Sequence, residues 1–186
     1  MGAWEDDGMR KDILITGTGG QGIVAAGEFL SDAIFRTGLE VINGRSYGAE
    51  ARGGSCRSEV IASDSEIYDL SLGEADILVV LSAPAFRRYQ GRVKAEGLII
   101  VDSAVLAEVD EGEPRGDVEI VAVDATVTAF ELGNTIVANM VLLGALSGKS
   151  ELISLDEMKA AINEGMRASM RDINLRALEA GYSAVS

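Results

Sequence analysis

The glycine-rich turn near the amino-terminal end of the chain is the feature that most constrains its fold. The turn follows a short apolar run at residues 12–16 and precedes apolar residues that recur at helical spacing over 23–37. This order of strand, turn and helix is the context in which a G-x-G-x-x-G pattern binds an anion, because free amides at the helix start and the helix dipole favour negative charge. We therefore predict an anion site at the turn, against the alternative of a tight packing turn; its residues are Gly17, Thr18, Gly19, Gly20, Gln21 and Gly22.

Strand-like and helix-like segments alternate along the rest of the chain. Continuous β-branched and leucine runs are typical of parallel strands covered on both faces. Their alternation with helices predicts an α/β, Rossmann-like fold, a layered and mostly parallel sheet flanked by helices. The expected strands are 12–16, 39–43 (which completes a βαβ unit by parallel pairing), 55–62, 77–81, 98–101 and 118–123, with a strand-like hairpin segment at 67–70. The expected helices are 23–37, 85–94, 134–146, 155–170 and 174–180.

Local signals mark the ends of several of these helices. The helix over 134–146 is apolar nearly all round and is therefore expected to be buried. Within it, Asn139 is expected to tie a neighbouring backbone rather than to contact a ligand. The end signals are the capping box Ser154–Glu157, the cap Asn134 and the stop glycines Gly38 and Gly181.

The length and composition favour one compact domain. The chain has 186 residues, of which 47% are hydrophobic and 25% are charged, an ordinary globular composition. Residues 1–11 are polar and acidic, so we expect a flexible amino-terminal extension followed by a single domain over 12–186. The start has no signal-peptide pattern, and the most apolar stretch is far shorter than the ~20 residues that cross a bilayer. We therefore expect a cytoplasmic protein without a membrane span.

Charge and residue types argue against several classes of function. The net charge of −14, without a basic stripe, disfavours nucleic acid as a partner. The absence of histidine rules out imidazole bases, Ser-His-Asp triads and the common zinc sites. Cys56 is the only cysteine, too few for an iron–sulfur cluster, and we expect it to be a small buried hydrophobe. We assign this chain no catalytic residue and no metal site.

The long polar loop after the second expected strand is the other candidate site. Its length and its glycines are typical of functional loops. It contains hydroxyls, a carboxylate and Arg52, whose guanidinium either holds a phosphate or carboxylate with two hydrogen bonds or pairs with Glu50 or a neighbouring subunit. The candidate residues of this loop are Ser46, Tyr47, Gly48, Glu50, Arg52 and Gly53.

A dinucleotide is the first ligand that the turn suggests, but the end of the second strand argues against it. NAD binding requires an acidic residue at that position to hold the ribose hydroxyls. This chain has Asn43, Gly44 and Arg45 instead. Arg45 would face the additional phosphate of NADP, so a self-sufficient NADP-binding oxidoreductase is an alternative function.

Together, the turn and the loop resemble the gamma subunit, or gamma domain, of 2-oxoacid:ferredoxin oxidoreductases. The sequences of the turn and the loop are most similar to those of the 2-oxoglutarate or branched-chain 2-oxoacid subgroup, although Ala49 stands where that loop usually has proline. The resemblance covers about residues 12–181. It rests on Ile15 to Val24, Ser46 to Gly54, Gly97 to Ser103, Gly133 with Asn134, Asn139 to Gly144 and Asn174 to Gly181.

The resemblance implies a component of an enzyme that decarboxylates a 2-oxoacid oxidatively with CoA, giving an acyl-CoA, carbon dioxide and reduced ferredoxin. In such complexes thiamine diphosphate lies between alpha and beta subunits, and a ferredoxin-like subunit or other domains hold iron–sulfur clusters. The gamma domain handles CoA and holds the assembly together. We therefore expect no tightly bound cofactor in this chain, CoA as a substrate, and no activity of the chain alone. A purely structural subunit is the remaining alternative.

Overall fold

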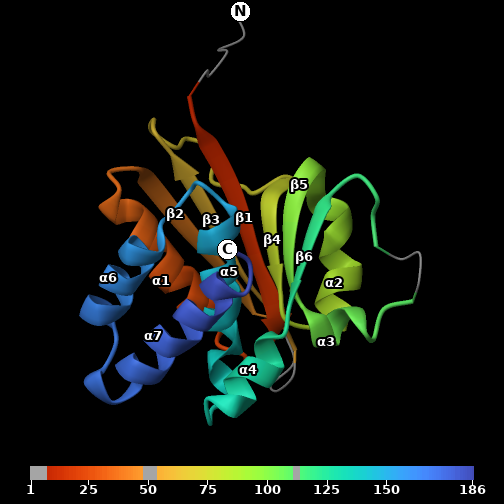
Figure 1. Cartoon of the computed structure of the whole chain (residues 1–186). Coiled ribbons are helices and arrows are strands. Elements are labelled where there is room, and N and C mark those ends of the chain that lie inside the picture. Colours follow the sequence, from red (N-terminus) through yellow and green to blue (C-terminus); the bar gives the residue numbers. More distant parts are fainter. Residues whose placement is uncertain (1–7, 48–53, 111–113) are drawn as a thin grey trace, which may run out of the picture.

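The fold is a six-stranded α/β sheet with helices on both faces, as the sequence predicts (Figure 1). The computed structural model describes residues 8–47, 54–110 and 114–186. Within them the strand order is β2-β3-β1-β4-β5-β6, and β1, β4, β5 and β6 run parallel. The strands are β1 Arg10–Thr18, β2 Glu40–Tyr47, β3 Ser55–Ser63, β4 Ala75–Val80, β5 Val93–Asp102 and β6 Glu119–Val123.

The helices form two layers that enclose the sheet. Helices α1, α5, α6 and α7 cover one face, and α2 with α3 covers the other. The helices are α1 Ile23–Arg36, α2 Ala83–Tyr89, α3 Ser103–Leu106, α4 Ala125–Glu131, α5 Ala138–Lys149, α6 Leu155–Gly165 and α7 Ala168–Ser183, with the 3-10 turns η1 Gln90–Arg92 and η2 Thr135–Val137. The short helices α3 and α4 are not predicted from the sequence.

The hydrophobic core has two halves because side chains alternate along each strand. On β1, Ile13 and Ile15 face the core under α1 and α5, whereas Leu14 faces the core under α2. All three are fully buried. Burial on both faces explains why the central strands are continuous apolar runs in the sequence.

The predicted parallel pairing of the second strand is wrong. Strand β2 pairs antiparallel with β3, from Glu40–Ser63 to Tyr47–Cys56, and β3 pairs antiparallel with β1. The chain therefore reverses between β2 and β3, and the returning strand β3 takes the place beside β1 that a βαβ unit would give to β2. The prediction of a strand-like segment at 67–70 is also wrong, since this stretch has no regular structure.

Several predicted helix boundaries are corrected by the structure. The expected helix over 85–94 ends at Tyr89, and Val93 and Lys94 belong to β5. The expected helix over 134–146 begins with the 3-10 turn η2, which Asn134 caps by accepting a hydrogen bond from the Ile136 amide at 3.1 Å. The expected helix over 155–170 is interrupted after Gly165, where α6 ends before α7 begins. The capping box of α6 is confirmed: the Ser154 amide donates to the Glu157 carboxylate at 2.8 Å, and the Ser154 hydroxyl accepts from the Glu157 amide.

Gly181 does not end a helix; it lies inside α7, where α7 packs against α5. A Cβ atom on Gly181 would lie 1.8 Å from the carbonyl oxygen of Val141, and one on Gly144 would lie 1.9 Å from that of Leu178. The two glycines thus let the two helix backbones approach each other closely. A glycine late in a helical pattern has the same appearance in sequence as a stop signal, which explains the error.

Along the described ranges, no helix has the length and apolar character that crossing a membrane requires.

Candidate functional site

The glycine turn lies at the point of the sheet where the helix connections change sides. Helix α1 follows β1 and packs on one face, whereas α2 follows the neighbouring parallel strand β4 and packs on the opposite face. In open α/β sheets, ligands bind outside the carboxyl ends of the strands at such a switch point. The turn between β1 and α1 occupies this position (Figure 1).

The backbone of the turn presents free amides at the start of α1. Gly20 and Gly22 have φ angles of 98° and 70°, which side chains disfavour, and Gly22 is the N-cap without a capping side chain. The first helical hydrogen bond runs from the Ala26 amide to the Gly22 carbonyl at 2.9 Å. The amides of residues 23–25 therefore have no acceptor within the helix. Such unpaired N–H groups at a helix start can donate to an anion.

The Gln21 side chain holds the turn in place. Its Oε1 atom accepts a hydrogen bond from the Thr18 amide at 2.7 Å, and its Nε2 atom donates to the Leu81 carbonyl at 2.8 Å. Leu81 directly follows β4, so Gln21 ties the turn to the end of the neighbouring strand. The side chain that we predicted as a ligand contact is thus engaged in positioning the backbone.

Asn139 holds the backbone of the turn through a hydrogen bond, as predicted. It lies in α5 and is 3% exposed, and its Nδ2 atom donates to the Gly22 carbonyl at 3.0 Å. A Cβ atom on Gly22 would lie 2.5 Å from the same Nδ2 atom. Gly22 is therefore required both by its φ angle and by the proximity of Asn139.

The second candidate loop adjoins the turn. The Gly19 amide donates to the Gly54 carbonyl at 2.9 Å, so the end of the loop contacts the turn directly. Ser46 and Tyr47 lie at the end of β2. The remaining loop candidates, Gly48, Glu50, Arg52 and Gly53, lie outside the described residues.

The sequence analysis missed a polar cluster next to the loop. The side chains of Arg57 and Ser55 on β3 interact with the hydroxyl of Tyr89, which lies at the end of α2. Burial raises the pKa of Tyr89, but the interactions with Arg57 and Ser55 and the positive charges of Arg88 and Arg57 together outweigh it, and the net shift is downward. Arg57 also lies 3.3 Å from Glu59. Alternating polar residues on β3 were the available signal, since they share one face of the strand.

Cys56 is a buried hydrophobe, as predicted. It is 6% exposed and belongs to the core under α1. Burial raises the pKa of its thiol, which favours the unreactive protonated form.

Arg45 is placed poorly for an NADP phosphate. It lies 2.8 Å from Glu28 of α1, in an ion pair of two half-exposed side chains. Moreover, β3 separates β2 from β1, so the end of β2 does not adjoin the turn as it does in a dinucleotide-binding βαβ unit.

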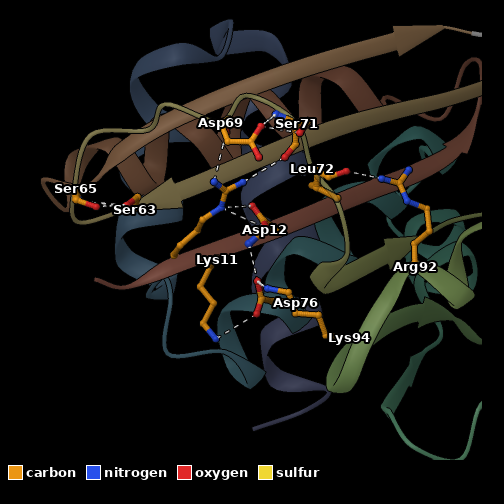
Figure 2. Close-up of polar contacts among 11 residues, drawn as sticks. Lys11, Asp12, Ser63, Ser65, Asp69, Ser71, Leu72, Asp76, Arg92 and Lys94 are labelled. Atoms are coloured by element: carbon orange, nitrogen blue, oxygen red, sulfur yellow. Dashed lines mark hydrogen bonds and ion pairs between the residues drawn. The ribbon is translucent and has the colours of Figure 1, made fainter. Parts of the chain in front are cut away.

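The opposite edge of the sheet carries a polar cluster of a different kind, centred on Asp76 (Figure 2). Its carboxylate accepts from the Asp12 amide at 2.8 Å and from Lys94 at 2.9 Å, and it lies 3.8 Å from Lys11. A cleft of about 720 Å³ lies beside this cluster. The cleft lining carries Lys11 and Lys94 against the carboxylates of Asp76, Glu96 and Glu151, so it has no excess positive charge for an anion.

Comparison with known proteins gives one consistent result. The family model described as pyruvate ferredoxin/flavodoxin oxidoreductase matches residues 12–184. The 2-oxoglutarate synthase subunit KorC of Methanothermobacter thermautotrophicus is 40% identical over 181 residues, which cover 95% of this chain and 96% of that subunit.

Solved structures agree with the sequence comparison. The gamma subunit of a keto/oxoacid ferredoxin oxidoreductase from Geobacter sulfurreducens is similar with a TM-score of 0.83 and 28% identity, over 95% of this chain and 97% of that one. The 2-oxoglutarate:ferredoxin oxidoreductase from Magnetococcus marinus, solved with 2-oxoglutarate, coenzyme A and succinyl-CoA bound, is similar with a TM-score of 0.84 and 26% identity, over 95% of this chain and 31% of that one. The chain therefore belongs to the pyruvate ferredoxin/flavodoxin oxidoreductase family, in which it corresponds to the gamma-type subunits.

Proposed function

We propose that this chain is the gamma subunit of a cytoplasmic, multi-subunit 2-oxoacid:ferredoxin oxidoreductase that converts 2-oxoglutarate or a related 2-oxoacid with CoA. Its part is to hold CoA and to join the assembly. The observation that carries the CoA role is the glycine turn at the switch point, with the amides of the first turn of α1 unpaired by the helix.

A phosphate of CoA is the group that we assign to the turn. The amides of 23–25 and the positive end of the helix dipole favour an anion there. Gln21 and Asn139 fix the backbone in this shape before a ligand arrives, so little ordering accompanies binding. Arg52 of the adjoining loop adds a positive charge in this proposal, and Ser46 adds a hydroxyl.

The redox and decarboxylation chemistry belongs to partner subunits. The chain has no histidine and only one cysteine, which is buried. In our proposal thiamine diphosphate is held by the alpha and beta subunits, and the iron–sulfur clusters are held by a ferredoxin-like subunit. The Magnetococcus marinus enzyme supports the assignment, because its structure contains coenzyme A together with a domain similar to this chain.

A matched pair of substitutions at Gly20 tests the phosphate assignment. Gly20 is exposed, and a Cβ atom added there would have no neighbour within 4 Å. Gly20→Asp places a negative charge at the turn, whereas Gly20→Asn has the same shape and the same backbone strain without the charge. In the assembled enzyme we expect Gly20→Asp to raise the KM for CoA about tenfold or more, because two like charges about 4 Å apart repel by ~4 kcal/mol near a protein surface, and ~1.4 kcal/mol already corresponds to tenfold. Gly20→Asn should change this KM much less, and neither should change the KM for the 2-oxoacid.

Calorimetry with CoA separates this proposal from a purely structural role of the loops. CoA would be titrated into the isolated chain and into the assembled complex, and Arg52→Ala would be compared kinetically with the unaltered protein. Heat of binding in the complex and a higher KM for CoA with Arg52→Ala are expected. Absence of heat in both titrations, with an unchanged KM, would refute CoA binding.

A further inference from the structure

Three large apolar side chains are exposed on one part of the surface. Val127 and Phe130 on α4 are 55% and 74% exposed, and Ile136 on η2 is 53% exposed. Val127 and Phe130 are three residues apart and lie on the same side of α4, while Ala125 and Ala129 are buried against the core. We call these three residues the α4 patch. A cluster of exposed apolar side chains, unlike single ones, indicates a contact surface.

The α4 patch adjoins the glycine turn. The Cγ2 atom of Ile136 would lie 3.8 Å from a Cβ atom on Gly22. Helix α4 follows β6 at the carboxyl edge of the sheet and packs against η2, and Figure 1 shows it beyond the end of β1. The same edge of the molecule therefore carries the proposed CoA phosphate site and the apolar surface.

The charged residues next to α4 in the sequence are acidic. The segment 120–148 contains Asp124 and Glu131 but no lysine or arginine. Asp124 and Glu131 flank α4, and both are exposed. A partner that covers the patch is therefore expected to combine an apolar pocket with a rim of lysine or arginine.

We propose that the α4 patch is the docking surface for the subunit that carries the 2-oxoacid site, with Phe130 as the anchor. The inference rests on the proposed function: CoA held by its phosphate at the turn must present its thiol to a reaction centre on another chain, so that chain must cover this edge. In the Magnetococcus marinus enzyme the domain similar to this chain is 31% of a longer polypeptide, so further protein belongs to the same chain.

Phe130→Asp with Phe35→Asp as its control tests the docking surface. Phe35 is 67% exposed near the end of α1, so both changes replace an exposed phenyl group with a carboxylate. The chain would be co-expressed with the other subunits, and the dissociation constant of the purified assembly would be measured without CoA. We expect Phe130→Asp to weaken association by about 30-fold or more, as loss of an anchor side chain does. Phe35→Asp should leave it within about twofold.

A second variant, Phe130→Ala, and the thermal unfolding midpoints test whether a folding defect causes the weakening. Since Phe130 is exposed, Phe130→Asp and Phe130→Ala should unfold at the same temperature as the unaltered chain. Equal affinity of Phe130→Asp and the unaltered chain, or equal weakening by Phe35→Asp, would overturn the docking proposal. Neither result would bear on CoA binding, which the Gly20 pair tests separately in the assembled enzyme.

Discussion

Gly22 shows how one residue meets a conformational and a packing requirement at the same position. We predict that Gly22→Ala lowers the free energy of unfolding by about 2–4 kcal/mol. A left-handed alanine costs ~1–2 kcal/mol, and displacement of Asn139 loses a hydrogen bond of ~1 kcal/mol and leaves a buried amide unpaired. Urea denaturation of the isolated chain measures the change.

Gly20→Ala is the control for this prediction. Gly20 also has a positive φ, but an added Cβ atom would meet no neighbour within 4 Å. Its substitution should therefore cost only the backbone strain. If the two variants lose equal stability, the contact between Asn139 and Gly22 contributes nothing.

At the residue scale, the sequence predicts positions better than roles. The glycines of the turn are recognisable because their spacing reflects a backbone requirement. The roles of Gln21 and Arg57 are not recognisable, because their partners Leu81 and Tyr89 are distant in sequence and meet them only in the folded chain. Asn139 is the exception, since an amide in an apolar helix must find a partner.

At the scale of elements, helix propensity and packing make opposite predictions for Gly181. Propensity alone predicts that Gly181→Ala stabilises α7 by ~1 kcal/mol. Packing predicts the reverse, because the new Cβ atom would lie 1.8 Å from the Val141 carbonyl oxygen and would force α5 and α7 apart. We expect a net loss of about 3 kcal/mol or more, measured by urea denaturation.

Gly116→Ala is the comparison for Gly181→Ala. A Cβ atom on Gly116 would have no neighbour within 4 Å, so its effect on unfolding should be small. Stabilisation of the chain by Gly181→Ala would contradict the close packing of α5 against α7.

The strands that are buried on both faces were predictable, but the pairing of β2 and β3 was not. An apolar run such as Ile77–Leu81 is a local sequence pattern, and it indicates a strand that is buried on both faces. Pairing depends on whether the chain reverses after β2, and a polar, glycine-dense loop is compatible with a crossover or a hairpin. The position of β3 beside β1 therefore required the structure.

At the scale of the whole molecule, our two proposals place the CoA site and the docking surface on one edge of the sheet. The net charge of −14 favours solubility and disfavours nucleic acid as a partner, but it does not indicate which surface of the chain binds a ligand or a subunit. Val127, Phe130 and Ile136 are ordinary apolar residues in the sequence. Only their exposure, with Ile136 beside Gly22, distinguishes them from core residues.

A ligand held at this edge by one chain and covered by another must couple binding to assembly. We predict that saturating CoA strengthens association of this chain with the other subunits by about fivefold or more, since coupling between two sites is typically 1–3 kcal/mol and is reciprocal. The measurement is the dissociation constant of the assembly with and without CoA. Gly20→Asp should abolish the difference, because its charge opposes the phosphate, and Gly20→Asn should retain it. An association constant that CoA leaves unchanged would mean that CoA is not shared across this edge, even if both the CoA site and the docking surface exist separately.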